Sequence, residues 1–277
     1  MVFLPRGPLV TPWDLSNADV VAAYDTVPLW SSIAASALLE TLPLAGVRTA
    51  LDIGCGTGTP WLELRARLGP SARVVGIDPW FAGLVRARHK SEVWHGSDAL
   101  LAAADGLVAP FPDGRFDLTV SCLTINNTPS PQVLLREMRR LTRQDGRMAL
   151  ATNLQGTFAS LYGAIGTLLA PADLDRLAAH VDKRPTVARL TRMAEAAGWR
   201  IERVVESDHR WRFADGAAVL AHPFLRLGFE ADWRAVVGEQ LWDALRQPLI
   251  DRLDSIGDLT GAVSLEIPTA VVIGVPA

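Results

Sequence analysis

The chain has 277 residues, of which 49% are hydrophobic and 21% are charged, so it carries enough apolar material for one large globular domain. Its formal net charge is −3 and no basic stripe is visible, so we expect no nucleic-acid partner, because phosphate contacts supply most of the affinity in such complexes. The sequence has neither an apolar run long enough to span a bilayer nor an N-terminal secretory signal, and we therefore expect a cytoplasmic protein without membrane insertion.

The N-terminal part of the chain is expected to be an arm followed by two helices. Prolines at positions 5, 8 and 12 indicate an extended arm over residues 1–16. Apolar spacing over residues 17–42 predicts two helical pieces that Pro28 interrupts. We take residues 1–45 as the arm and cap helices, and residues 46–277 as the main domain.

Between residues 49 and 152, short apolar runs alternate with helical patterns. The predicted strands are 49–53, 73–78, 92–95, 116–121 and 147–152, and the predicted helices are 60–68, 81–89 and 132–141. This alternation favours parallel strand pairing with helices on both faces of the sheet. Ligands of such sheets bind at the carboxyl ends of the strands, near the point where the strand order reverses.

After residue 152 the regular alternation stops. The pattern predicts helices over 155–182 and 186–198, a strand over 200–213, helices over 216–258 and a closing strand over 263–275. We interpret 155–182 and 214–260 as helical lid insertions around the last strands, and not as a second domain. The expected fold is a doubly wound, mostly parallel seven-stranded α/β sheet with a helical lid.

The most informative segment follows the first predicted strand. Gly54, Gly56 and Gly58 stand at alternate positions between a strand and a helix, where glycines let the backbone turn tightly and approach a ligand. Asp78 ends the second strand, where a carboxylate can accept hydrogen bonds from the ribose hydroxyls of a nucleoside. A dinucleotide fingerprint would require a glycine at position 59, but Thr59 stands there, so nicotinamide binding is the poorer interpretation.

Five segments, in order, carry a resemblance to one family. They are 51–60 with the glycine loop, 74–78 with the acidic strand end, 96–99, the run 109–117 that reads APFPDGRFD, and 134–146. Together these segments resemble the class I S-adenosylmethionine-dependent methyltransferases, and most of all the ubiquinone and menaquinone biosynthesis, or type 11, branch. The resemblance covers roughly residues 45–155 and implies a Rossmann-like methyltransferase fold.

The resemblance also implies a site for S-adenosylmethionine at the glycine loop. Asp52 and the three loop glycines shape the methionine end of this site, and Cys55 lines it without doing chemistry. Asp78 holds the ribose. Ser121 and Cys122, at the tip of the fourth strand, lie beside the methionyl part. Both cysteines are expected to be reduced, because their surroundings are apolar.

The adenine end of the cofactor is assigned to two further segments. Pro79 or Trp80 packs on the ring, although Trp80 could equally be a core residue. In the segment that includes Ser97, Asp98 takes the adenine amino group, and the backbone of Ala99 contacts a ring nitrogen.

Two groups of residues are candidates for closing the site and contacting the methyl acceptor. Tyr24 and Trp30 belong to the N-terminal helices that fold over the cofactor in the resembled family, although a core role is open for both. Tyr162 and Phe224 are candidate acceptor contacts from the apolar helical insertions. An apolar cover suits a hydrophobic or aromatic acceptor.

No residue is required as a general base, because alignment of the acceptor with the methyl group supplies much of the rate. Asn126 and Asn127 follow the fourth strand and could orient an acceptor. They do not form the Asn/Asp-Pro-Pro-Tyr motif of enzymes that methylate amino groups of nucleic acid bases or glutamine. His209 and His222 are the other candidates for a base, with a structural role open for each.

These inferences lead to a small-molecule methyltransferase with an undetermined O-, N- or C-acceptor, in secondary metabolism or quinone-like biosynthesis. No metal site is expected, because no clustered ligand set is recognisable. The protein is expected to be a monomer or a homodimer. The alternatives are an enzyme of this fold that binds the cofactor but catalyses a non-methylating reaction such as a cyclisation, and a nicotinamide oxidoreductase.

Overall fold

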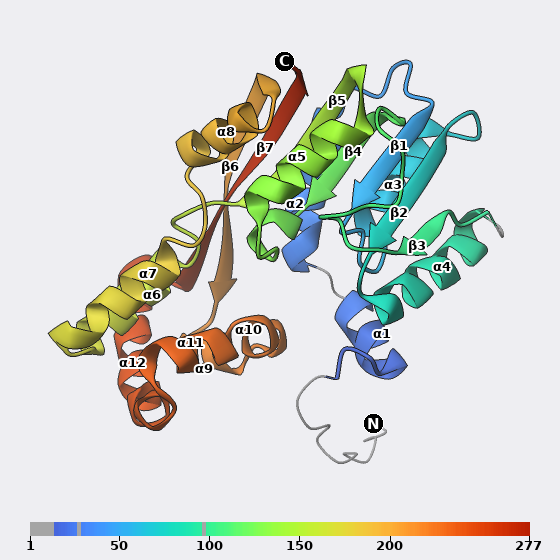
Figure 1. Ribbon diagram of the computed structural model, residues 1–277. Helices are drawn as coiled ribbons and strands as arrows, with labels where there is room; N and C mark the ends of the chain where they lie inside the picture. Colours follow the sequence, from blue (N-terminus) through green and yellow to red (C-terminus); the bar gives the residue numbers. More distant parts are fainter. Residues whose placement is uncertain (1–13, 27–28, 96–97) are drawn as a thin grey trace, which may run out of the picture.

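A single seven-stranded sheet organises the chain (Figure 1). The computed structural model describes residues 14–26, 29–95 and 98–277, so residues 1–13 of the arm expected over 1–16 lie outside the described residues. The strands are β1 (Thr49–Ile53), β2 (Arg73–Asp78), β3 (Leu101–Ala103), β4 (Phe116–Cys122), β5 (Thr142–Asn153), β6 (Trp199–Phe213) and β7 (Val263–Pro276).

The strand order is β3-β2-β1-β4-β5-β7-β6, and β7 is antiparallel to both of its neighbours while the other pairs are parallel. The chain moves outward from β1 to β3 on one side and from β4 onward on the other. The order therefore reverses between β1 and β4, which is where ligands of such sheets bind. The expected doubly wound, mostly parallel sheet is confirmed.

Helices cover both faces of the sheet. The helices before β6 are α1 (Ala18–Thr26), α2 (Leu29–Thr41), α3 (Thr59–Leu68), α4 (Phe81–His95), η1 (Thr124–Asn126), α5 (Pro131–Leu141), α6 (Ala159–Leu168), η2 (Pro171–Asp173), α7 (Leu174–Val181) and α8 (Val187–Ala196). Those between β6 and β7 are α9 (Gly216–Ala221), α10 (Pro223–Gly228), α11 (Glu230–Val237) and α12 (Glu239–Thr260). Helices occupy the predicted N-terminal pair over 17–42 and both predicted insertions, 155–182 and 214–260.

Local sequence explains several helix starts. Pro60 and Pro131 occupy the first turns of α3 and α5, where a missing N–H leaves no hydrogen bond unmade. Thr186 caps α8, because its hydroxyl accepts a hydrogen bond from the Arg189 amide at 3.1 Å. α5 is strongly amphipathic, and it buries Leu134 and Met138 against the sheet.

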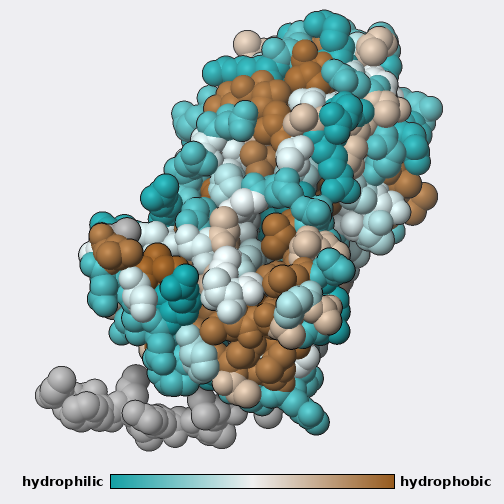
Figure 2. Space-filling model, turned by 90° about the vertical axis from the view of Figure 1, so that its left-hand side faces the viewer, coloured by the Kyte–Doolittle hydropathy of each residue, from teal (hydrophilic) through white to brown (hydrophobic). Residues whose placement is uncertain are grey.

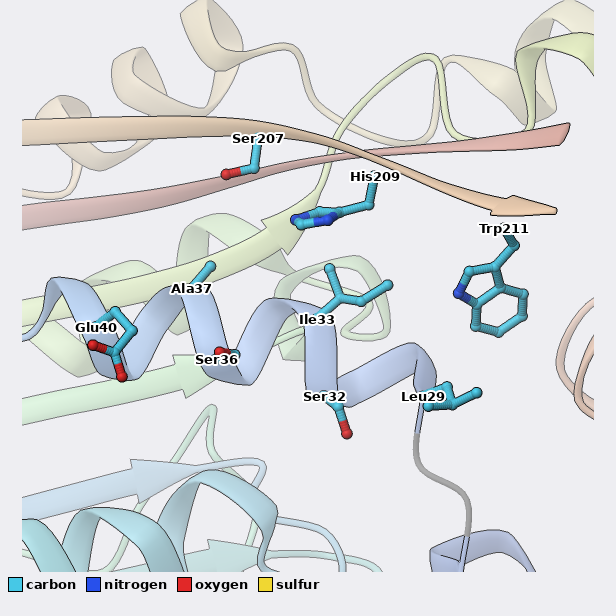
Figure 3. A pocket seen from close by; sticks show the side chains of 9 residues that line it. All are labelled: Leu29, Ser32, Ile33, Ser36, Ala37, Glu40, Ser207, His209 and Trp211. Carbon is cyan, nitrogen blue, oxygen red and sulfur yellow. The ribbon is translucent and has the colours of Figure 1, made fainter.

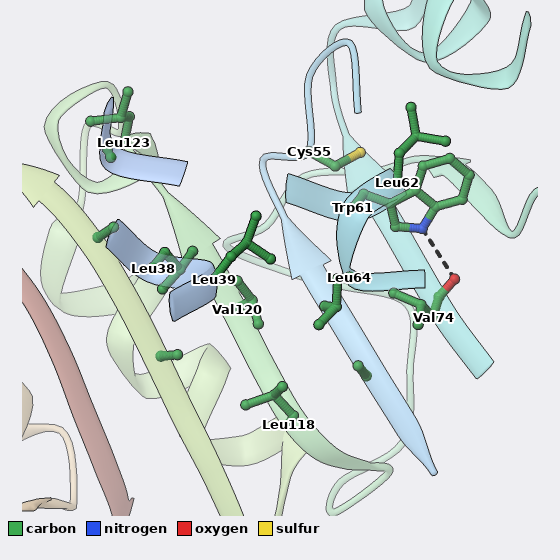
Figure 4. Packing of buried hydrophobic residues seen from close by; sticks show 14 of the residues in the cluster. Leu38, Leu39, Cys55, Trp61, Leu62, Leu64, Val74, Leu118, Val120 and Leu123 are labelled. Carbon is green, nitrogen blue, oxygen red and sulfur yellow. Dashed lines mark hydrogen bonds between the residues drawn. The ribbon is translucent and has the colours of Figure 1, made fainter. Parts of the chain in front are cut away.

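The two faces of the sheet have separate cores. α2, α3 and α4 cover one face, where Trp61 of α3 is fully buried and its indole N–H donates to the Val74 carbonyl at 3.1 Å (Figure 4). α5 and α8 cover the other face, where the fully buried Trp199 donates from its indole to the Leu135 carbonyl at 3.0 Å. These cores hold β1 and β4 rigid beneath the strand ends that form the site.

A third core joins the two helical insertions. Side chains of α6, α7 and α9–α12 pack together with the first half of β7, so the two insertions form one unit, which we call the lid. On the face shown in Figure 2, hydrophobic side chains also reach the surface in the half of the molecule that holds the lid. Within the lid, Leu259 of α12 is 88% exposed.

One predicted strand is wrong. Residues 92–95 continue α4, and the third strand lies further along the chain at Leu101–Ala103. Val93 and Trp94 are 71% and 67% exposed, which suits a helix surface and not an inner strand. Glu92 also pairs with Arg88 one turn earlier at 3.1 Å, which supports the last turns of the helix.

Candidate functional site

The glycine loop lies at the carboxyl end of β1, beside the reversal of strand order. Gly54, Gly56 and Gly58 have φ angles of +78°, +52° and +92°, which side chains rarely adopt. A Cβ at Gly54 would collide with the Thr124 hydroxyl, so that contact requires glycine. A Cβ at Gly56 would meet no described atom within 4 Å, so Gly56 borders open space that a ligand can occupy.

Asp78 lies directly beside this loop. One of its carboxylate oxygens accepts a hydrogen bond from the Gly56 amide at 2.8 Å, and the other accepts one from the Trp80 amide at 2.7 Å. Burial raises the pKa of Asp78, and these two hydrogen bonds oppose that rise. The expected meeting of the loop and the acidic strand end is therefore present.

Asp52 is a buried acid without a partner. Its side chain is 0% exposed, and neither carboxylate oxygen has a hydrogen-bond partner among the described residues. Burial, with a smaller contribution from the nearby charge of Asp78, raises its pKa from 3.8 to about 8. An unpartnered buried carboxyl is costly, and a cationic group of a ligand would remove that cost.

The end of β4 supports the loop from the other side. The hydroxyls of Ser121 and Thr124 donate to the Ile53 carbonyl at 3.0 and 3.1 Å, so Ser121 ties β4 to the end of β1. Cys55 and Cys122 are free thiols, as expected, and burial raises the pKa of both well above the ordinary value. Thiols held in this state are poor nucleophiles.

The structure places the residues assigned to adenine away from the carboxyl ends of the strands. Asp98 and Ala99 precede β3 and thus lie at its amino end, whereas the ligand edge is formed by carboxyl ends. The Asp98 carbonyl accepts a hydrogen bond from Arg65 at 3.2 Å. The assignment depended on a strand at 92–95 that is part of a helix, and Ser97 lies outside the described residues, so the contacts of Asp98 and Ala99 with adenine stay predictions.

The segment after β3 contains residues that the sequence analysis missed. Asp78 pairs in register with Ala103, so Asp105 and Gly106 follow two and three residues beyond that pair, at the carboxyl edge. Asp105 accepts a hydrogen bond from the Leu107 amide at 2.8 Å. The apolar run 100–104 ending at Asp-Gly was the available signal for this strand.

The N-terminal helices bring aromatic rings to the site. Tyr24 contacts Trp80 edge to face with ring centroids 5.6 Å apart, and the Trp80 indole donates to the Leu15 carbonyl at 2.7 Å. Trp80 is half-buried beneath these contacts, and Pro79 beside it is exposed. Phe224 of the lid lies 6.3 Å from the Tyr24 ring. Tyr24 therefore joins the cofactor side of the molecule to the lid.

Asn126 and Asn127 lie just beyond the end of β4, as expected, but their side chains are engaged. The amide of Asn126 donates to the Asn153 carbonyl at 2.9 Å, and that of Asn127 donates to the Leu123 carbonyl at 3.0 Å. Leu123 has a φ of +62°, so these bonds hold a strained turn. The side-chain nitrogen Nδ2 of Asn153 is buried and has no hydrogen-bond partner among the described residues.

Tyr162 lies inside the lid core and is 5% exposed. Its hydroxyl lies 3.0 Å from His180 Nε2 and accepts a hydrogen bond from the Trp233 indole at 3.2 Å. His180, which the sequence analysis did not select, is buried, and this burial lowers its pKa. These hydrogen bonds hold Tyr162 within the lid core, and its role as an acceptor contact stays a prediction.

The two candidate histidines occupy different places. His222 lies between α9 and α10, where its ring contacts Trp211 and Phe213, and burial lowers its pKa. His209 lies on β6 in a groove beside α2 (Figure 3). Neutral His222 can accept a proton at neutral pH, but nothing in its contacts links it to a reacting atom.

Comparisons with known proteins agree with this geometry. A family described as "Methyltransferase domain" matches residues 51–150. The demethylmenaquinone methyltransferase of Mycolicibacterium gilvum is 30% identical over 223 residues, which cover 76% of this chain and 88% of that protein. The chain belongs to the class I S-adenosylmethionine-dependent methyltransferases of the type 11 branch.

Solved structures show the fold of this methyltransferase. A putative methyltransferase from Bacillus halodurans has a TM-score of 0.59 at 16% identity, covering 87% of this chain and 97% of that one. The cyclase SpnF has a TM-score of 0.55 at 18% identity, covering 96% and 98%. Family membership decides between the two cofactor classes in favour of S-adenosylmethionine.

The loop residues fit this cofactor. Asp52 supplies an unpartnered buried carboxyl for a molecule that carries an ammonium and a sulfonium group, and Gly56 leaves open space beside Asp78.

Among the described residues, no group of acidic, cysteine and histidine side chains could hold a metal ion. No helix in the described part of the chain is long and apolar enough to cross a membrane.

Proposed function

We propose that this methyltransferase transfers the methyl group of S-adenosylmethionine to a small hydrophobic or aromatic molecule, through an oxygen, nitrogen or carbon atom of that acceptor. The observation that carries the cofactor half of the proposal is the buried, unpartnered Asp52 beneath a glycine loop whose Gly56 amide donates to Asp78. The aromatic residues that close the site carry the acceptor half.

Each carboxyl group has a distinct role in this proposal. Asp52 faces the ammonium group at the methionine end, and Asp78 holds the ribose hydroxyls. Pro79 and Trp80 flank the adenine. Because the segment after the third strand contacts adenine in the resembled family, Asp105 takes the role first assigned to Asp98, and the backbone of Gly106 takes that of Ala99.

The bound cofactor supplies an electrophilic methyl group on a positively charged sulfur. The chain's own residues align the acceptor with the S–CH₃ bond and exclude water from it. An acceptor that must lose a proton gives it to a neutral base, for which His222 is the candidate, because His209 lies in the separate groove beside α2. Asn126 and Asn127 hold the turn at the end of β4 on which the acceptor would rest.

The acceptor class follows from the cover of the site. Trp30 contacts Phe158, Phe224 and Phe229, with ring centroids 5.5, 5.7 and 5.1 Å apart. Through Phe224 this cluster continues to Tyr24 and Trp80. An aromatic cluster beside a site favours apolar ligands, because ligand pockets use apolar side chains for affinity and a few polar groups for orientation.

The alternative is an enzyme that binds S-adenosylmethionine and catalyses a non-methylating reaction. The likeness to the cyclase SpnF motivates it, although that likeness concerns the fold alone. Incubation with methyl-labelled cofactor and a panel of phenols, enols and amines separates the two functions. Transfer of label to any compound supports methylation, whereas conversion of a compound without transfer supports the alternative.

Binding of S-adenosylhomocysteine to an Asp78→Ala variant tests the site itself. We expect the affinity, measured by calorimetry, to fall about 30-fold, because the change removes hydrogen bonds from a charged acceptor worth roughly 2 kcal/mol. Asp113→Ala is the control, because Asp113 is 79% exposed and pairs with Arg140. Equal affinity of the two variants would overturn the ribose assignment.

A further inference from the structure

A groove separate from the glycine loop runs between α2 and β6 (Figure 3). Its cavity volume is about 530 Å³. Small-molecule sites commonly have volumes of roughly 300–1,000 Å³, so the groove is large enough for a small organic ligand. It lies beside the edge strand of the sheet, whereas the glycine loop lies at β1.

The α2 side of the groove is amphipathic. Residues spaced three or four apart lie on one face of a helix, and this face presents an apolar row beside a polar row. The apolar row is Leu29, Ile33 and Ala37, and the polar row is Ser32, Ser36 and Glu40. A ligand in the groove therefore meets an apolar surface along one side and hydroxyl groups along the other.

The β6 side adds three alternate residues, Ser207, His209 and Trp211, whose side chains point toward α2 (Figure 3). His209 Nε2 is buried and has no hydrogen-bond partner within the described part of the chain. A buried ring nitrogen without a partner is costly. A hydroxyl group of a ligand can satisfy it with either tautomer of the ring, because a hydroxyl both donates and accepts.

The charge of the lining favours a neutral ligand. Glu40 contributes a carboxylate, but this group already pairs with Arg67 at 2.9 Å. The other lining residues are apolar side chains, serines and His209. A charged ligand would find no unpaired opposite charge among these lining residues.

A series of aromatic contacts links the lining of the groove to the cofactor side. Trp30 lies 5.7 Å from Trp211 and 5.7 Å from Phe224, measured between ring centroids. Phe224 in turn contacts Tyr24 beside the glycine loop. The groove and the cofactor side are thus connected through one aromatic cluster.

We propose that the groove binds a neutral, amphipathic small molecule with an aromatic or alicyclic body and a hydroxyl group. The body packs on Leu29, Ile33 and Trp211, and the hydroxyl pairs with His209 Nε2. Because Trp211 also packs on Trp30 and Phe224, an occupant supports the contact between α2 and the lid.

A photoreactive phenol that carries a trifluoromethyldiazirine group tests the proposal directly. After irradiation and proteolysis, mass spectrometry should find the label within residues 29–40 and 207–211. Ser207→Phe fills the groove and should reduce this labelling at least tenfold. Asp208→Phe places the same ring one residue along the strand, on the opposite face of the sheet, and should leave labelling unchanged.

Binding of S-adenosylhomocysteine reports folding in these variants, and it should be unchanged in both. If Ser207→Phe does not fold, Ala37→Phe fills the same groove from α2. Labelling mainly outside the two segments, or equal labelling of the filled and control variants, overturns the proposal. If the wild-type protein does not bind S-adenosylhomocysteine, the proposed function is contradicted. The labelling result then still decides, independently, whether the groove binds a small molecule.

The contribution of His209 has its own test. The wild-type protein should take up the phenol probe about fivefold better than the matching anisole, because only the phenol can satisfy Nε2 with either tautomer. His209→Leu should label equally with the two probes. A preference that survives in His209→Leu would place the hydroxyl elsewhere and overturn this part of the proposal.

Discussion

Three carboxyl groups at the carboxyl edge of the sheet, Asp52, Asp78 and Asp105, differ in how well the protein itself satisfies them. Asp78 and Asp105 accept backbone hydrogen bonds, whereas Asp52 has no partner among the described residues. Because its pKa is raised to about 8, Asp52 holds a proton in the unliganded protein at pH 7. The unfolded chain gives up this proton near pH 4, so this group makes folding less favourable as the pH rises from about 4 to 8.

Cofactor binding should therefore release a proton from Asp52. The ammonium group of the ligand favours the ionised carboxylate, so we expect release approaching one proton per S-adenosylhomocysteine at pH 7, and an affinity that rises from pH 6 to pH 8. Calorimetric titrations in buffers with different ionisation enthalpies measure the released protons. Asp52→Asn keeps the shape of the side chain and should abolish this release. An equal release by the variant would show that another group titrates.

The proposed contact of Asp105 with adenine gives a paired prediction. Asp105→Ala should weaken S-adenosylhomocysteine binding about tenfold, through loss of one charged hydrogen bond worth roughly 1.5 kcal/mol. Asp98→Ala removes the same side chain at the amino end of β3 and should have no effect. Calorimetry on both variants separates the two assignments, and the opposite pattern would restore Asp98.

At the residue scale, the positions of candidate site residues were predictable from the sequence where a motif directly follows a clearly recognisable strand. The loop glycines and Asp78 follow apolar strands whose ends are unambiguous, so their meeting was predictable. The segment proposed to contact adenine was not predictable in this way, because Glu92-Val93-Trp94-His95 has strand-like composition but lies in a helix. The unpartnered state of Asp52 depends on which atoms surround it, and that information appears only in the folded chain.

At the scale of the elements, ion pairs join α1 to α4. Asp25 is 3% exposed in its side chain and pairs with Arg86 at 2.9 Å and Lys90 at 2.8 Å, both on α4. Burial raises the pKa of Asp25, but hydrogen bonds from Lys90, Thr57 and Arg86 outweigh it and lower the pKa below 3.8. The pairing is therefore present at neutral pH and is lost only as the pH falls through this lowered value.

Removing the ion pairs of Asp25 should increase local unfolding of α1. In Asp25→Asn we expect the amides of residues 18–26 to exchange with deuterium at least tenfold faster, because the change leaves two partly buried cations without their carboxylate. Asp19→Asn changes an exposed acid on the same helix and should leave exchange nearly unchanged. Exchange followed by mass spectrometry measures both. If the two variants behaved alike, packing of Tyr24 and not the ion pairs would hold the helix.

Elements were predictable in proportion to their burial. β1, β2 and β4 are buried between two helical layers, so they read as apolar runs between glycines and turns. β3 has three residues and is only partly buried, so its pattern is weak. The lid helices were predictable as elements, but their mutual packing with β7 was not, because it joins segments far apart in the chain.

At the scale of the whole molecule, α2 contributes side chains both to the core on the sheet and to the core of the lid. Trp30 is a central contact between them, because it packs on Phe158, Phe224 and Phe229 of the lid side and on Trp211 of β6. The lid also has a core of its own, with Trp233 stacked on Phe229 and near Trp242. Stability of the whole is therefore expected to depend on this aromatic joint as well as on the two cores.

Trp30→Ala should separate the unfolding of the two parts. The lost ring contacts are worth about 3 kcal/mol, which corresponds to a fall of roughly 6–10 °C in Tm for a chain of this size. We expect calorimetry to show a first transition for the lid and a second for the sheet, with S-adenosylhomocysteine raising mainly the second. Trp94→Ala is the control, because Trp94 is 67% exposed and its loss should change Tm little. A single unbroken transition with an unchanged Tm in Trp30→Ala would mean that the backbone connections through β6 and β7, and not the aromatic joint, make the lid and the sheet unfold together.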